Sequence, residues 1–297
     1  STPFVPPIAG ADLKGVLSFR DIYDVNTMLD MAKSAKNAVV IGGGLLGLEA
    51  AYGLKQRGMN VTVLHLMDRI MDRQLDTKAS HMLKKSIEQK GIRIITEANT
   101  ESLIGEDGHV KSVHLKDGTV LDADLVVFAV GIRPNMALAQ SAGLRCNRGV
   151  LVNDTMQTYD PSIYAVGECI EHRNQTFGLV EPLWGQAFIC ASHLAEHGSL
   201  TFKAPTVPTQ LKVSGCDVFS AGNFEPLDDF EDIILNDEKR QIYKRIIIQK
   251  DKVIGAVLFG DTDDGAWYAE LIADQSSISS IRNKLLFGKD FALKKAG

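Results

Sequence analysis

Short apolar runs and longer stretches of spaced apolar residues alternate along the first third of the chain. Short, mostly apolar runs occupy residues 38–41 (AVVI), 61–64 (VTVL) and 92–95 (IRII), and the segments between them carry an apolar residue at every third or fourth position. The runs are typical of buried strands, and the spaced pattern is typical of helices that bury one face. Strands that alternate with helices in this way predict a parallel sheet.

Residues 100–121 show a different pattern, which is typical of antiparallel strands. Asp-Gly pairs at 107–108 and 117–118 separate short runs in which apolar and polar residues alternate. Asp-Gly is a strong signal for a β-hairpin, so we expect a β-meander here. A buried apolar strand is expected to follow at 125–130.

The second half of the chain predicts two further regions, separated by a proline-bearing link at 203–208. Before the link we expect strands at 150–153 and 163–166 and a helix at 182–196. After the link, apolar runs predict strands at residues 211–213, 218–221, 242–248 and 253–258. A helical pattern follows these strands, so we expect the last region to be an α+β domain.

Between the first strand and the first helix lies the motif G-x-G-x-x-G, formed by Gly42, Gly44 and Gly47. In dinucleotide-binding folds the first glycine makes a tight turn, the second lets the backbone approach a pyrophosphate, and the third lets the helix pack on the strand. The N–H groups and the dipole at the helix start then favour the anion. The ordinary alternative is a glycine-rich turn in a βαβ unit, but the strands on both sides favour nucleotide binding.

The composition is that of a globular protein of about two domains. Of the 297 residues, 45% are hydrophobic and 23% are charged, and the net charge is −5. An acidic chain without a basic stripe argues against nucleic acid as a partner, and no apolar run is long enough to cross a membrane. The four cysteines are widely spaced and form no CxxC pair, so we assign no metal site and expect a cytoplasmic protein with reduced thiols.

Several longer strings match a known family. They are GGGLLGLE at 42–49, HLMDRIMDRQLD at 65–76, GIRPN at 131–135, TYDPSIYAVGE at 158–168, VGECIEH at 166–172 and FGLVEP at 177–182. Together they resemble the two-dinucleotide-binding flavoprotein disulfide reductases, also called pyridine nucleotide-disulfide oxidoreductases. Within that superfamily they resemble most the flavoprotein part of the NAD(P)H-dependent nitrite reductase large subunit, and rubredoxin reductases are close relatives.

The resemblance implies an α/β fold built from several domains. We expect a remnant of the FAD-binding domain with a linker at 1–35, and a Rossmann-type NAD(P)H-binding domain with parallel sheet and β-meander at 36–133. The second part of the FAD-binding domain is expected at 134–204, and a C-terminal α+β interface domain at 205–297. The family carries two glycine motifs and this chain carries one. We therefore expect a fragment of a larger polypeptide that lacks the FAD phosphate-binding half and is inactive by itself.

The function implied by the resemblance is an NAD(P)H-dependent oxidoreductase that passes electrons from NADH or NADPH through FAD to a downstream centre. The expected partners are iron–sulfur and sirohaem domains of the same or a partner chain, or a second copy of this chain. No side chain is expected to act as a catalyst, because the cofactors carry the chemistry. Two alternatives stay open, namely a rubredoxin- or ferredoxin-reductase-like enzyme and a dinucleotide-binding sensor or docking module without turnover.

The candidate cofactor-binding residues follow from the same resemblance. They are Gly42, Gly44, Leu45, Leu46, Gly47, Glu49, His65, Arg69, Gly131, Gly167 and Glu168. Leu45 and Glu49 are expected near the nicotinamide, Gly131 beside the dinucleotide, and Glu168 at the ribityl chain of FAD. Glu49 is equally well explained as a helix carboxylate favoured by the dipole, and Glu168 as a solvated loop acid.

His65 departs from the usual pattern, in which the second strand ends with an acid that binds the ribose 2′-OH of NADH. With Arg69 nearby, His65 could accept the 2′-phosphate of NADPH. Alternatively, His65 borders the site and Arg69 is a solvated loop residue. The sequence therefore leaves the choice between NADH and NADPH open.

Overall fold

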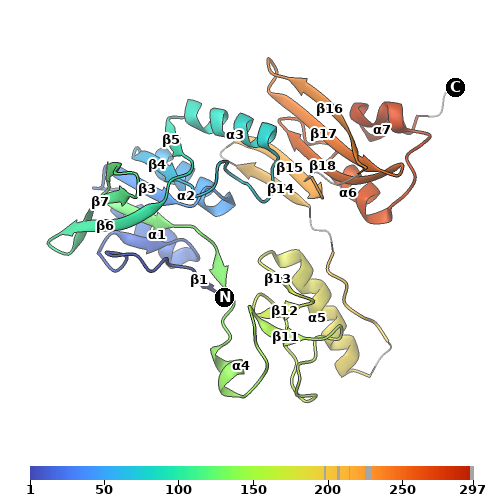
Figure 1. Ribbon diagram of the computed structural model, residues 1–297, viewed down its shortest axis with the longest axis horizontal. Coiled ribbons are helices and arrows are strands. Elements are labelled where there is room, and N and C mark those ends of the chain that lie inside the picture. The colour runs from blue at the N-terminus through green and yellow to red at the C-terminus, as the bar shows by residue number, and fades with distance from the viewer. Residues whose placement is uncertain (197–198, 206–207, 214, 225–228, 295–297) are drawn as a thin grey trace. The chain divides into compact units, whose positions relative to one another are not determined.

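The computed structural model describes residues 1–196, 199–205, 208–213, 215–224 and 229–294 (Figure 1). By its internal contacts the chain divides into two units. One unit consists of Ser1–Phe4 with Gly131–Val207, and we call it the small unit. The other consists of Val5–Val130 with Pro208–Gly297, and we call it the nucleotide unit. Each unit is described by itself.

A five-stranded parallel sheet forms the first half of the nucleotide unit (Figure 1). Its strands are, in spatial order, β2 (Val16–Ser18), β9 (Leu125–Phe128), β3 (Asn37–Ile41), β4 (Asn60–Leu64) and β5 (Ile92–Ile95). All neighbouring strands pair in parallel, which confirms the sheet predicted from the alternating pattern. The middle strands β3 and β9 are buried on both faces, as strands of parallel sheets are.

Different elements cover the two faces of this sheet. Helices α1 (Ile22–Met31), α2 (Leu45–Gln56) and α3 (Thr77–Gln89) share one hydrophobic core with alternate strand residues such as Val40 and Val63. The opposite face, which includes Val39, packs against the meander β6 (Thr100–Glu106), β7 (His109–Leu115) and β8 (Val120–Asp122). The meander is antiparallel, as the two Asp-Gly turns predicted.

The second half of the nucleotide unit is a five-stranded antiparallel sheet with helices on one face. Its spatial order is β14 (Thr209–Val213), β15 (Cys216–Gly222), β18 (Lys252–Phe259), β17 (Ile242–Gln249) and β16 (Glu231–Asp237). Helix α6 (Gly265–Asp274), the 3-10 helix η1 (Arg282–Phe287) and α7 (Lys289–Ala292) follow. Four of the strands were predicted. Strand β16 was missed because acids at both ends leave only three apolar residues between them.

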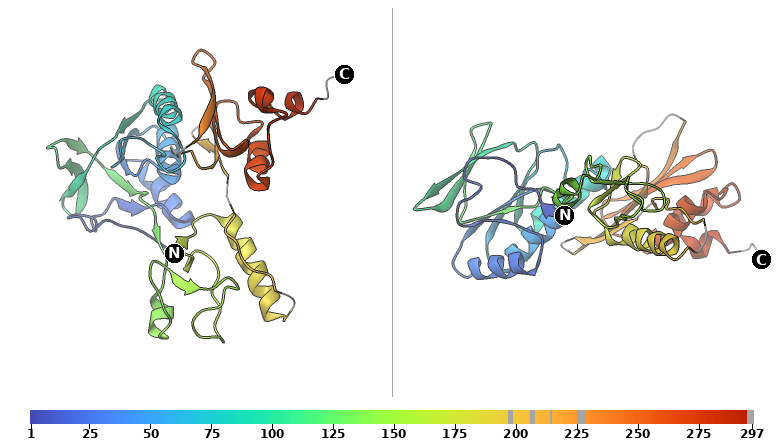
Figure 2. Two further views of the ribbon diagram at one scale, coloured as in Figure 1. Left: turned by 45° about the vertical axis from the view of Figure 1, so that its right-hand side comes forward. Right: turned by 90° about the horizontal axis from the view of Figure 1, so that it is seen from below.

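The two halves of the nucleotide unit share a core. Buried residues of the C-terminal sheet, among them Val218, Tyr243 and Val257, belong to the same hydrophobic cluster as helices α2 and α3. Helix α3 contacts β18, and both figures show it beside the C-terminal sheet (Figures 1 and 2). The C-terminal sheet therefore stabilises the fold that carries the glycine motif.

The small unit contains a three-stranded sheet, two helices and a short pair of strands. The sheet is β11 (Val150–Val152), β12 (Ile170–His172) and β13 (Gln175–Thr176), the helices are α4 (Ala137–Ser141) and α5 (Val180–Leu194), and β1 (Thr2–Pro3) pairs with β10 (Ile132–Arg133). The strand predicted at 163–166 is wrong, since this segment forms only an isolated bridge at Tyr164. Among the described residues, the segment makes only two backbone hydrogen bonds with residues 156–158, in which the Ile163 and Met156 carbonyls accept the N–H groups of Thr158 and Ala165, and these are too few to extend into a ladder.

The four-part domain division stays a prediction, but one difference is clear. Residues 1–35 were expected to be a remnant of the FAD domain and a linker. In the structure Val16–Ser18 forms the edge strand β2 of the parallel sheet, paired with β9. Asp21 caps the helix that follows, in a capping box with Asp24. A three-residue strand was too short to stand out in the hydrophobic pattern.

Candidate dinucleotide-binding site

The first and third glycines of the motif are required by close packing. Gly42 has φ +125°, and a Cβ atom there would lie 2.2 Å from the carbonyl oxygen of Ala129 on the neighbouring strand segment. A Cβ atom on Gly47 would lie 1.8 Å from the carbonyl oxygen of Gly42. Both distances are far below contact distance, so only hydrogen fits. These two glycines let helix α2 start directly on the end of strand β3.

The second glycine has a different environment. A Cβ atom on Gly44 would meet nothing within 4 Å, so the space above this residue is open. Gly44 is the N-cap of helix α2, and no side chain caps the helix start. The amide groups of the first turn and the helix dipole therefore face a space that an anion can enter. This is the arrangement that a dinucleotide pyrophosphate requires.

The loop that follows strand β4 is fixed to the glycine turn through Gly43. The Gly43 N–H donates to Nδ1 of His65 over 3.0 Å, and the Gly43 carbonyl accepts the N–H of Met71 over 2.9 Å. The Ile70 side chain packs at the same point, since a Cβ on Gly43 would lie 2.9 Å from it. Sequence reasoning missed this role, because Gly43 lies between the motif glycines and Met71 is distant in sequence.

His65 has hydrogen bonds at both ring nitrogens. Because Nδ1 accepts from Gly43, the ring proton lies on Nε2, which donates to Oδ1 of Asp72 over 3.0 Å. Arg69 places Nη1 3.4 Å from the carboxylate of Asp68. The structure thus brings His65 and Arg69 to one loop, each beside an aspartate. Their proposed roles in nucleotide binding stay predictions.

The remaining candidates of the nucleotide unit lie on helix α2. Leu45 is half-buried and packs against the main core, whereas Leu46 is exposed. Glu49 lies on the exposed side of the helix, yet partial desolvation raises the pKa of its carboxyl group above the usual value. One turn of helix separates Leu45 from Glu49, so their side chains lie on the same side of α2.

Gly131, Gly167 and Glu168 belong to the small unit. Gly167 has φ +102° with open space at the Cβ position, and its N–H donates to Oε1 of Gln186 over 2.7 Å. The Nε2 group of the fully buried Gln186 has no hydrogen-bond partner among the described residues. An unsatisfied buried donor beside an open glycine turn fits a bound group that carries hydrogen-bond acceptors, as the polar edge of a flavin does.

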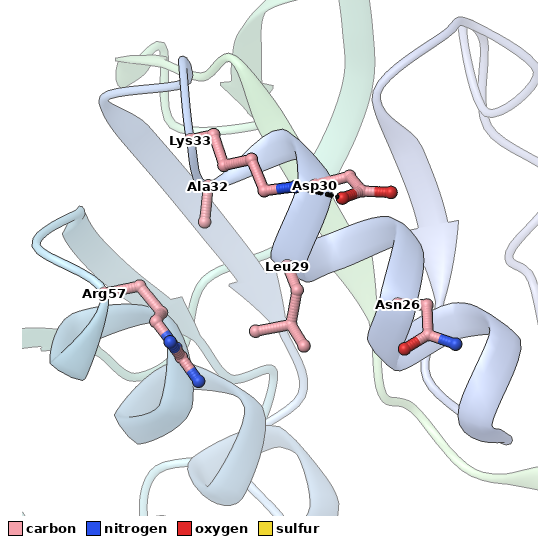
Figure 3. Close-up of a pocket in the computed structure, with 6 residues that line it drawn as sticks. All are labelled: Asn26, Leu29, Asp30, Ala32, Lys33 and Arg57. Carbon is pink, nitrogen blue, oxygen red and sulfur yellow. Dashed lines mark hydrogen bonds and ion pairs between the residues drawn. The ribbon is translucent and has the colours of Figure 1, made fainter.

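A pocket between helix α1 and the end of helix α2 has no part in this site (Figure 3). It is lined by Asn26, Leu29, Asp30, Ala32, Lys33 and Arg57. Arg57 follows the last residue of α2, and a helix of that length spans about 18 Å. The pocket therefore lies at the opposite end of α2 from the glycine turn. Its charged pair, Lys33 and Asp30, is exposed.

The described residues contain neither a helix able to span a membrane nor a side-chain cluster able to hold a metal ion. In the described part of the chain, no helix combines the length and the apolarity needed to span a membrane. Within the same residues, no group of three or more His, Cys, Asp or Glu side chains is arranged to hold a metal ion.

The chain matches two family models. Residues 1–187 match the model described as pyridine nucleotide-disulphide oxidoreductase, and residues 208–276 match the rubredoxin NAD+ reductase C-terminal domain. The first match covers well over half of the chain and includes the glycine turn. The second lies within the C-terminal antiparallel sheet and helix α6.

The similar proteins agree with these matches. The chain is 48% identical over 279 residues to a nitrite reductase [NAD(P)H] of Bacillus subtilis (strain 168), which covers 94% of this chain and 34% of that protein. It is 42% identical over 286 residues to an assimilatory nitrate reductase electron transfer subunit of the same organism, covering 96% and 37%. The chain thus spans about a third of the length of these relatives.

A solved structure extends the comparison to the fold. An FAD-dependent pyridine nucleotide-disulphide oxidoreductase from Desulfovibrio vulgaris is 26% identical and superposes with a TM-score of 0.78, over 96% of this chain and 77% of that one. The family models cover the parallel sheet with its glycine turn, most of the small unit, and the antiparallel C-terminal sheet. From these matches and this geometry, the chain belongs to the pyridine nucleotide-disulphide oxidoreductase family.

Proposed function

We propose that this chain is the NAD(P)H-entry part of a flavoprotein oxidoreductase of the nitrite reductase type. The family depends on FAD and NAD(P)H. The observation that carries the proposal is the start of helix α2, where Gly44 leaves open space in front of a helix end that no side chain caps. The similarity to nitrite reductase and to a nitrate reductase electron transfer subunit supports the proposal that the enzyme is of the nitrite reductase type.

In this proposal the chain's residues bind and orient, and they do not react. Gly42 and Gly47 bring the strand and helix together, and Gly44 leaves room for the pyrophosphate. Leu45 and Glu49 lie on the side of α2 proposed to face the nicotinamide. A bound flavin would supply hydride chemistry, taking electrons in pairs from the nicotinamide and releasing them singly. Gly131, Gly167 and Glu168 of the small unit are proposed as further cofactor-binding residues.

The electron acceptor is proposed to lie in iron–sulfur and sirohaem domains of the same or a partner chain. The protein is proposed to act in the cytoplasm and to form a homo-oligomer.

A second candidate function rests on a specific observation. Residues 208–276 match the C-terminal domain of rubredoxin NAD+ reductases, which favours a small iron–sulfur protein as acceptor. The gene of the whole protein separates the two, because a sirohaem domain in the same reading frame would support the first and exclude the second.

The central test of the proposal is direct titration of the purified chain with NADH and NADPH by calorimetry. We expect saturable binding of at least one nucleotide in the micromolar range, about 8 kcal/mol in free energy, which a prepared anion site can supply. Adenosine should bind much more weakly, because it lacks the pyrophosphate. Failure of both nucleotides to bind a folded sample would contradict the proposal.

A further inference from the structure

Strand β4 ends without the acid that normally selects NADH. In Rossmann folds a carboxylate about 20 residues after the glycine motif hydrogen-bonds the ribose 2′-OH. In this chain residues 60–67 contain no Asp or Glu, and His65 follows the strand. The nearest acids downstream are Asp68 and Asp72, both on the loop after the strand.

The two aspartates differ in how they are held. The side chain of Asp68 is 64% exposed, and its partner is the neighbouring Arg69. The side chain of Asp72 is 24% exposed and accepts a hydrogen bond from Nε2 of His65. His65 is in turn fixed by the Gly43 N–H. Only Asp72 is thus connected by two consecutive hydrogen bonds to the glycine turn.

The backbone holds Asp72 at the same place. The N–H of Met71, the residue before Asp72, donates to the carbonyl of Gly43 over 2.9 Å. Met71 has φ +52° and is fully buried, so this part of the loop is anchored against the core. The carboxylate of Asp72 therefore lies beside the turn on which the pyrophosphate is proposed to bind, on the side of the turn next to strand β4.

We propose that Asp72 is the specificity residue that binds the ribose diol of NADH and excludes the 2′-phosphate of NADPH, with His65 as its positioning residue. The proposal rests on the proposed function. A carboxylate accepts hydrogen bonds from both ribose hydroxyls, whereas it repels a phosphate in the same place. Both nitrogens of His65 are occupied within the chain, which leaves the imidazole no free donor for a 2′-phosphate.

The test compares the dissociation constants of NADH and NADPH for the unaltered chain and for Asp72→Asn. The unaltered chain should bind NADH more tightly. Asp72→Asn should weaken NADH about tenfold, as expected for the loss of a hydrogen bond to a charged group. The same change should not weaken NADPH, so the preference should fall at least about tenfold. Asp68→Asn is the matched control and should leave the preference unchanged.

The positioning role of His65 is tested by how its substitutions change the preference for NADH over NADPH. His65→Leu removes both ring nitrogens and should lower the preference as Asp72→Asn does, while His65→Gln keeps a donor and should restore part of it. A merely structural role would weaken both nucleotides equally. A preference for NADPH in the unaltered chain, or an unchanged preference in Asp72→Asn, overturns the assignment. Absence of binding by either nucleotide to the unaltered chain would instead contradict the proposed function.

Discussion

The four glycines between residues 42 and 47 serve different physical purposes. Gly42 and Gly47 exclude a side chain because backbone atoms lie at the Cβ position. Gly43 excludes one because His65 and Ile70 occupy the space. Gly44 alone among these four leaves its Cβ position open, and it has φ −84°, which any residue can adopt. The fold therefore requires glycine at three of these positions, and at Gly44 we propose that the bound nucleotide requires it.

Replacement of Gly44 by Val separates binding from folding. The backbone tolerates a side chain here, so the protein should fold with a melting temperature close to that of the unaltered chain. The isopropyl group should occupy the space in front of the helix start and raise the dissociation constant for NADH at least about tenfold. Calorimetric titration and thermal denaturation measure the two effects.

The control for this experiment is Gly42→Ala, which should lower the stability of the fold. Its methyl group would meet the Ala129 carbonyl in a backbone conformation with φ +125°. We expect loss of more than about 2 kcal/mol of stability. An NADH affinity unchanged by Gly44→Val would show that the pyrophosphate does not bind at this turn.

At the scale of single residues, the sequence predicted spacing but not contacts. The positions of Gly42, Gly44 and Gly47 follow from the motif, because their roles are local to one turn. The hydrogen bonds of His65 to Gly43 and Asp72 join residues 22 and 7 positions apart through an irregular loop. No periodicity marks such a loop, so these contacts were visible only in the structure.

At the scale of elements, prediction succeeded where a pattern was regular. Strand β5 and helix α3 agree with the sequence to within one residue, because each has an apolar face with the period of its structure. The strand expected at 163–166 did not form, since this segment makes only an isolated bridge with the chain just before it. Strand β12 (Ile170–His172) pairs with β11 instead, and its three residues include a buried Glu171 that no pattern would place in a core.

Helix α2 offers a prediction of stabilisation. Gly53 lies on its exposed face with nothing within 4 Å of the Cβ position. Gly53→Ala should raise the free energy of unfolding by about 0.8 kcal/mol, because alanine loses less backbone entropy on folding and favours the helix. The midpoint of urea denaturation measures the change.

Gly58, just beyond the end of the same helix, is the matched control. It also has open space at the Cβ position, but it follows the helix end with φ +87°. Gly58→Ala should destabilise the protein by about 1 kcal/mol, since a side chain is strained in this conformation. Equal effects of the two substitutions would contradict the conformational explanation.

At the scale of the whole molecule, one buried carboxylate joins the two halves of the nucleotide unit. Asp76 caps helix α3 through the Ala79 N–H over 2.9 Å. Its other oxygen accepts the hydroxyl of Tyr243 over 2.8 Å and Nη1 of Arg245 over 3.2 Å, both from strand β17. Burial and the neighbouring Asp76 raise the pKa of Tyr243 well above its usual value, so the phenol stays protonated and donates.

Asp76→Ala should therefore cost about 3 kcal/mol of stability, because it removes a helix cap and leaves a buried hydroxyl and a guanidinium without this partner. Tyr243→Phe should cost about 1 kcal/mol. Lys78→Ala is the control, since its ion pair with Glu238 joins the same two halves at the surface and should contribute less than about 1 kcal/mol. Denaturation with urea measures the loss of stability in each of the three variants. A loss for Asp76→Ala no larger than for Lys78→Ala would contradict the structural role assigned to Asp76.

The small unit should respond to acid through Asp154. Its carboxylate binds Arg173 through two hydrogen bonds and His172 through one, and these contacts, with Arg173 the larger cause, lower the pKa of Asp154 to about 2. A carboxyl with a lowered pKa in the folded state stabilises the protein above its unfolded pKa of about 4 and loses that contribution as the pH falls towards 2. Since 34% of the side chain is exposed, solvent screening reduces the effect to about 1 kcal/mol.

Asp154→Asn should therefore lower stability at pH 7 and flatten the dependence of stability on pH between pH 4 and pH 2, as measured by thermal denaturation across that range. Asp160→Asn, on an exposed turn of the same unit, is the control. Parallel pH curves for Asp154→Asn and the unaltered chain would show that this cluster does not govern acid stability.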